Sequence, residues 1–99
     1  KMAELSLKDL IKAVSNMDSN SGVSQSIYVI EECSELIKEL MKKERRKENK
    51  TNIINEACDV LTTVFVLLDQ YGVSEAYIKE QISFKCKRAL DRYANDGEV

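Results

Sequence analysis

The most apolar stretch of the chain contains two acidic residues. Between Ile53 and Leu68 most of the other residues are apolar or small, so a helix here must bury most of its circumference. Glu56 and Asp59 lie inside this stretch, and their carboxylates are expected to be buried with it. Isolated ionised carboxylates are costly in a dry interior unless they are paired or bind a metal. The stretch therefore predicts a core helix that carries a candidate site.

A second acidic group lies upstream, and its spacing matches the first. At about 100° per residue, Glu32 and Glu35 share one face of a helix, as Glu56 and Asp59 share one face of the next. Two such helices packed antiparallel can bring four carboxylates to one point. An all-oxygen ligand set suits Mg²⁺, with Mn²⁺ as an alternative. The chain has no histidine, which argues against Glu-x-x-His di-iron bundles and His-containing zinc sites.

Ordinary salt bridges also explain these acidic residues. Glu32, Glu35 and Glu39 fit a solvated helix face, because lysines follow at the i+3 and i+4 positions, namely Lys38, Lys42 and Lys43. The second pair, Glu56 and Asp59, could instead bind a basic residue of a neighbouring helix. The combination of the two acidic groups favours the metal site.

The positions of the helix-breaking residues predict an all-α fold of four helices. There is no proline, and Gly22 and Gly72 are the natural breaks, with a charged connector from Lys42 to Lys50. The expected helices run from about Ser6 to Met17, Ser24 to Lys43, Thr51 or Asn52 to Tyr71, and Ser74 to Ala94.

The third expected helix is apolar on more flanks than one short chain can cover. Ile53, Val60 and Leu67 lie on one flank, and Ile54 and Leu61 on another. An exposed apolar surface of this size favours aggregation unless a partner covers it. We therefore expect an antiparallel helical bundle that is completed by dimerisation.

Composition indicates one soluble, intracellular domain. The 99 residues are 43% hydrophobic and 32% charged, and we treat 1–99 as one domain with its core at 24–94. We expect no membrane span, no signal peptide and a cytoplasmic location. Cys33, Cys58 and Cys86 are expected to be reduced core residues. A net charge of −2 gives no general attraction for nucleic acid, so no nucleic-acid partner is expected.

Two motifs resemble those of a known family. Glu31-Glu32-Cys33-Ser34-Glu35 followed by Glu56-Ala57-Cys58-Asp59 resembles the E-E-x-x-E and E-x-x-D signature of the MazG-like, all-α nucleoside triphosphate pyrophosphohydrolases. The resemblance covers roughly residues 24–92, including a basic last helix. Ser34 stands where many relatives carry glycine.

The resemblance implies an activity and a ligand set. The expected reaction is hydrolysis of an NTP or dNTP between the α- and β-phosphates, giving a nucleoside monophosphate and pyrophosphate. Glu32, Glu35, Glu56 and Asp59 would hold Mg²⁺, and Glu31 and Glu35 are the candidate catalytic carboxylates. Glu31 could orient or deprotonate the attacking water, or be a surface carboxylate. Relatives form homodimers or dimers of dimers.

Substrate contacts are expected on the last helix and on the second. Lys85, Arg88 and Arg92 share one stripe and could bind the triphosphate, or form a solvated helix end. Tyr28, one turn before Glu32, could stack on the base or belong to the core, and Asn20 could read the base edge.

Three alternatives remain open. Within the same chemistry, the chain could be a dUTPase/dCTPase-type enzyme or a phosphoribosyl-ATP pyrophosphohydrolase. From a different class, it could be a non-catalytic helical dimerisation or regulatory module that retains the acidic motif.

Overall fold

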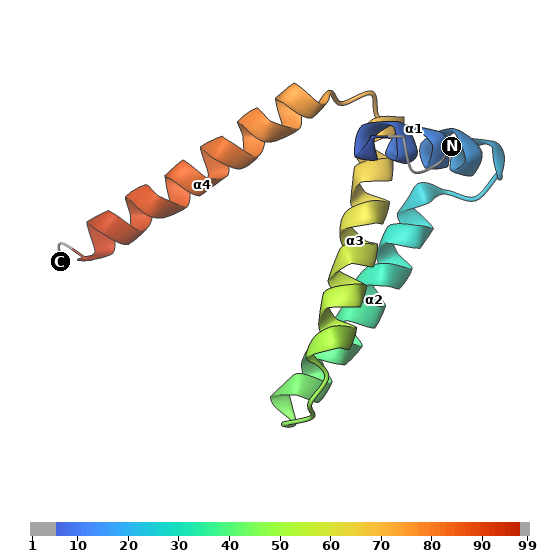
Figure 1. The fold of residues 1–99 in the computed structure, drawn as a ribbon. Helices are drawn as coiled ribbons and strands as arrows, with labels where there is room; N and C mark the ends of the chain where they lie inside the picture. The colour runs from blue at the N-terminus through green and yellow to red at the C-terminus, as the bar shows by residue number, and fades with distance from the viewer. Residues whose placement is uncertain (1–5, 98–99) are drawn as a thin grey trace.

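The computed structural model describes residues 6–97 and contains four α-helices (Figure 1). No strand occurs within this range, so the all-α prediction is confirmed. The bounds are α1 at Leu7–Asn20, α2 at Gln25–Glu44, α3 at Lys50–Gln70 and α4 at Glu75–Gly97.

The two predicted glycine breaks separate the helices as expected. Gly22 and Gly72 have φ values of 81° and 74°, which favour glycine and let the chain turn after α1 and α3. Ser6 caps α1 by accepting a hydrogen bond from the backbone N–H of Asp9. Ser24 similarly accepts from the N–H of Ser26 at the start of α2.

The predicted start of the third helix was wrong. Thr51 and Asn52 lie inside α3, and the residue that precedes the helix is Asn49. The Asn49 side chain makes no hydrogen bond to the first turn of α3. It bonds Glu39 of α2 instead, so its capping capacity is used in a tertiary contact. The connector between the helices is therefore shorter than the predicted 42–50 segment.

The helices α2 and α3 form an antiparallel hairpin, and α1 packs on α3 near the open end of that hairpin (Figure 1). Val66 of α3 is 1% exposed and is the one fully buried apolar side chain among the described residues. An ion pair of 3.3 Å between Lys12 Nζ and Asp69 Oδ2 links α1 to α3. α3 is thus the central helix.

The last helix extends away from the hairpin (Figure 1). The radius of gyration is 17.1 Å, compared with about 13 Å for a compact domain of this length. The apolar stripe of α4 is therefore largely uncovered within one protomer. Ile78 is only partly covered, and the other members of that stripe are exposed, namely Ile82, Cys86, Ala89, Leu90 and Tyr93.

Exposed apolar side chains also line the hairpin. Ile30 and Ile37 of α2 and Ile54 and Leu61 of α3 are all exposed. By length and by its mean hydropathy of 1.3, α3 could span a membrane. Only 6% of its apolar segment is buried inside the protomer. The protomer thus leaves much of α3, its most apolar helix, uncovered.

The expectation that the cysteines are core residues was wrong for two of the three. Cys33 is half-buried, while Cys58 and Cys86 are exposed. They were assigned to the core because they fall among apolar residues of α3 and α4. Both helices nevertheless leave these two positions on faces that the protomer does not cover.

Candidate metal centre

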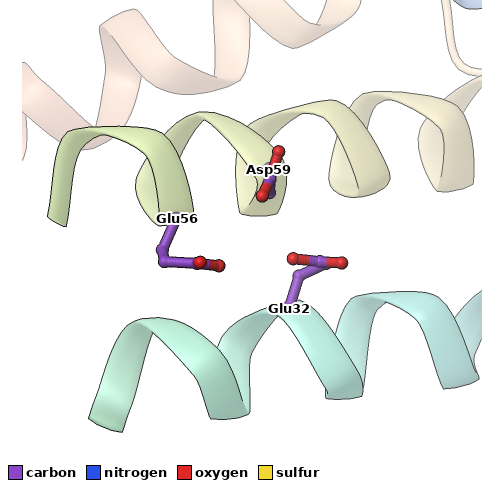
Figure 2. A group of neighbouring side chains, drawn as sticks. All are labelled: Glu32, Glu56 and Asp59. Carbon is purple, nitrogen blue, oxygen red and sulfur yellow. The ribbon is translucent and has the colours of Figure 1, made fainter. Parts of the chain in front are cut away.

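Three of the four predicted metal ligands converge between α2 and α3. Glu32, Glu56 and Asp59 each offer a carboxylate oxygen, and these oxygens lie within 4.8 Å of one another. Figure 2 shows Glu32 projecting from α2 toward α3 and Glu56 projecting from α3 toward α2. Asp59 lies one turn further along α3, so the antiparallel hairpin brings the two acidic motifs together.

The centre lies at the surface of the hairpin. Glu32 and Glu56 are half-buried, and Asp59 is exposed. A ligand can therefore reach the carboxylates from solvent, while the walls of the two helices reduce their hydration. The sequence predicted deeper burial, because α3 was expected to be covered on more of its circumference.

Burial and crowding both raise the pKa of Glu32. Partial removal from water is the main cause, followed by the negative charges of Asp59 and Glu56 across the centre. Glu31 and Glu35 add smaller contributions of the same sign. The unligated centre thus holds Glu32 in an unfavourable environment that a cation would relieve.

The donor set fits a hard divalent cation. All three donors are carboxylates, which Mg²⁺ and Mn²⁺ prefer. Mg²⁺ usually retains several waters and takes only one or two protein carboxylates together with substrate phosphates. Three carboxylates at a surface position are therefore sufficient for such an ion, and they leave room for a phosphate.

Glu35, the fourth predicted ligand, is outside the cluster of oxygens. Its Oε1 lies 3.2 Å from Nζ of Lys38 on the same helix, and its side chain is 51% exposed. This surface ion pair is the arrangement that the solvated-face interpretation predicts. Pairs of this kind contribute less than about 1 kcal/mol, so Glu35 can exchange Lys38 for another cation at little cost.

Glu39 has a different environment from Glu32 and Glu35, although it shares their helix. It is 8% exposed, and its carboxylate accepts hydrogen bonds from Lys42 at 2.7 Å and from Asn49 at 3.2 Å. The bonds from Lys42 and then Asn49 lower its pKa. Glu39 is therefore a paired structural carboxylate between α2 and the start of α3.

The remaining predicted residues on α1 and α2 lie outside the cluster of carboxylates. Glu31 is exposed beside Glu32, and Tyr28 is half-buried one turn earlier in α2. Asn20 is the exposed last residue of α1. Their assigned roles stay predictions.

The predicted phosphate-binding residues do not lie on the α2–α3 hairpin that carries the carboxylates. Lys85, Arg88 and Arg92 are exposed on α4, which extends away from the hairpin (Figure 1). The Arg88 guanidinium lies 5.9 Å from the centre of the Phe84 ring, within cation–π range.

Two polar residues near the centre were missed by sequence reasoning. Gln25 is 4% exposed, and its Nε2 donates to the carbonyl of Thr63 across the hairpin at 3.1 Å. Asn49 contacts both the backbone carbonyl and the carboxylate of Glu39. A signal was present in the sequence, because Gln25 lies seven residues before Glu32 and Asn49 lies seven residues before Glu56.

Comparison with known families agrees with this geometry. The MazG nucleotide pyrophosphohydrolase domain matches residues 21–93, a range that includes α2, α3 and most of α4. The chain belongs to this family. No curated protein and no solved structure matches the chain. Membership in the MazG family points to a hydrolase that acts on nucleotides, and the acidic cluster is a candidate site for the divalent metal.

Proposed function

We propose that the protein is a Mg²⁺-dependent nucleoside triphosphate pyrophosphohydrolase, which converts an NTP or dNTP to the monophosphate and pyrophosphate. The convergence of Glu32, Glu56 and Asp59 carries the proposal. Three carboxylates this close repel one another, and a divalent cation is the simplest ligand that would relieve the repulsion. The family match supplies the substrate class.

The carboxylates would perform two tasks. Glu32, Glu56 and Asp59 would hold Mg²⁺, which when bound neutralises phosphate charge and acidifies water. Glu35 would join the ligand set or accept a proton after leaving Lys38. Glu31, adjacent to the centre, would orient or deprotonate the attacking water.

The basic residues of α4 would act across a dimer. Lys85, Arg88 and Arg92 would bind the triphosphate, whose negative charge cannot approach three carboxylates without cationic support. Within one protomer α4 extends away from the hairpin. We therefore propose that the basic residues that serve one centre come from α4 of a second copy of the chain, packed against the first.

Exposed apolar surface supports a homodimer. Ile54 and Leu61 form an exposed stripe along α3, and Leu90 and Tyr93 are exposed on α4. Covering these surfaces with a second copy would place α3 in a shared core. We propose this arrangement, rather than insertion in a membrane, as the reason for the high hydropathy of α3, since α3 also carries the acidic centre. Two such dimers could associate further.

The base would bind toward the open end of the hairpin. Tyr28 lies one turn from Glu32 in that direction and has an aromatic face suited to stacking. Asn20, at the end of α1, could contact the base edge.

Product identification tests the proposed reaction. The purified protein is incubated with Mg²⁺ and each canonical NTP and dNTP, several damaged nucleotides, dUTP and phosphoribosyl-ATP, and the phosphorus products are identified. Release of pyrophosphate with a nucleoside monophosphate is expected for at least one substrate. Release of inorganic phosphate with a diphosphate would contradict the cleavage position, and absence of turnover would favour a non-catalytic helical module.

A further inference from the structure

Three polar pairs cross the α2–α3 hairpin at intervals of seven residues. Gln25 of α2 contacts Thr63 of α3, and Glu39 of α2 contacts Asn49 at the start of α3. Between them, Glu32 faces Glu56, seven residues from each neighbouring pair on both helices (Figure 2). The acidic pair thus lies midway between two hydrogen-bonded pairs.

Of the two hydrogen-bonded pairs, Glu39 and Asn49 at the closed end of the hairpin form the stronger one. Asn49 Nδ2 lies 2.8 Å from the backbone oxygen of Glu39 and 3.2 Å from its Oε1, while Lys42 Nζ lies 2.7 Å from its Oε2. The carboxylate lies beside Asn49, the residue that precedes α3, where the partial positive charge of the helix favours an anion. This pair fixes the start of α3 against the last two turns of α2.

The pair at the open end closes the other side of the centre. Gln25 Nε2 donates to the carbonyl of Thr63 at 3.1 Å, and Gln25 is 4% exposed. Gln25 and Glu39 are the two buried residues of α2. Both are polar, so the most deeply buried contacts that α2 makes are directional hydrogen bonds. Unlike apolar contacts, such bonds are lost when one helix slides along the other.

The hydrogen-bonded pairs are needed to fix the register, because the repulsion between Glu32 and Glu56 opposes the packing of α2 on α3. Carboxylate oxygens of Glu32, Glu56 and Asp59 lie within 4.8 Å of one another, so the ionised carboxylates repel one another. A slip of one turn would move Glu32 by about 5.4 Å along α3. A metal centre of short ligand distances does not tolerate such a displacement.

We propose that Gln25 and Glu39 are positioning residues that fix the register of α2 against α3 and thereby hold Glu32 opposite Glu56 and Asp59 for the metal. This inference rests on the proposed metal-dependent function, and it adds two residues that touch neither the metal nor the substrate. Their substitution would reduce metal affinity while the fold and the three ligands remain.

Mn²⁺ binding tests the inference without relying on turnover. Free Mn²⁺ is measured by electron paramagnetic resonance during titration of the wild type, Glu39→Ala, Gln25→Ala and the double variant, at a temperature where circular dichroism shows all to be folded. Each single substitution is expected to weaken Mn²⁺ binding by about tenfold, the lower range for loss of supporting contacts around a metal. The double variant should bind more weakly than either.

Two matched variants separate positioning from a loss of charge or stability. Glu44→Ala removes an exposed glutamate from the same end of α2 and should keep wild-type affinity. Glu39→Gln keeps an oxygen acceptor for Asn49, and should recover part of the affinity that Glu39→Ala loses. Wild-type Mn²⁺ affinity in the double variant, with only a lower melting temperature, would overturn the inference and leave the proposed function intact. A wild type that fails to bind Mn²⁺ would overturn both.

Discussion

Glu32 on α2 and Glu56 on α3 present carboxylate oxygens within 4.8 Å of one another. Neither is fully exposed, and Asp59 adds a third negative charge within the same 4.8 Å limit. The hairpin therefore holds like charges together at its middle, with hydrogen-bonded pairs on either side. Such an arrangement lowers the stability of the unligated protein and favours a cation.

The pH dependence of stability should report this strain. The folded-state pKa of Glu32 is raised from 4.5, so the unligated folded protein holds this proton more tightly than the unfolded chain. Stability contributed by the group is present below pH 4.5 and is lost as the pH rises through the raised pKa. Glu32→Gln should therefore become more stable relative to wild type over that window.

Denaturant unfolding at several pH values measures the difference, with Glu44→Gln as an exposed control. Added Mg²⁺ should reverse it, since binding to the ionised centre stabilises the wild type increasingly as the pH rises. A constant difference between wild type and Glu32→Gln from pH 4 to 8 would contradict the raised pKa.

Substitutions of Glu35 and Lys38 distinguish the two possible roles of Glu35, as a metal ligand or as the partner of a surface salt bridge. If Glu35 leaves its lysine to serve the metal, Glu35→Gln should weaken Mg²⁺ binding by about tenfold or more, whereas Lys38→Ala should leave it unchanged or slightly stronger. If the pair is only a surface salt bridge, both variants should bind like wild type. Calorimetric titration of Mg²⁺ into the two variants distinguishes these outcomes.

Assembly should depend on the exposed stripe of α3. Leu61 is 55% exposed in the protomer, so Leu61→Glu should leave the protomer fold intact while placing a charge in the proposed dimer core. We expect the wild type to sediment as a dimer or larger species at micromolar concentration, and Leu61→Glu to shift toward monomer or aggregate. Asn55→Glu, on another side of α3, is the matched control. A monodisperse wild-type monomer would refute the dimer.

Mixed dimers can test whether α4 serves the partner's centre. Glu56→Gln and the triple variant Lys85→Ala/Arg88→Ala/Arg92→Ala should each be strongly impaired as homodimers. When the two are unfolded together and reassembled, a site built from both chains would restore about one quarter of wild-type activity by random pairing. Activity no higher than the sum of the separate variants would show that the basic residues do not act across the dimer.

The helices could be predicted from the sequence because their signals are local. Gly22 and Gly72 mark turns that need positive φ, and the i,i+3 spacing places Glu56 and Asp59 on one face. The start of α3 was missed, because Asn49 bonds Glu39 across the hairpin rather than its own helix. That choice depends on tertiary contacts.

The position of α4 could not be predicted for a related reason. Its apolar stripe, which includes Leu90 and Tyr93, shows that the helix needs a partner. The pattern does not show whether the partner belongs to the same chain or to another copy. Similarly, the acidic spacing did not distinguish Glu35, which pairs with Lys38, from Glu32, which faces α3.

The most direct test of the metal centre is Mg²⁺-dependent pyrophosphate release by Asp59→Asn compared with wild type. Asp59 is the exposed member of the cluster, so the substitution removes a ligand charge with little effect on packing, and the melting temperature of the unligated protein should hold or rise. Calorimetric Mg²⁺ binding and pyrophosphate release should fall together by at least about tenfold. Wild-type binding and turnover in Asp59→Asn would contradict the assignment of this cluster as the catalytic metal centre.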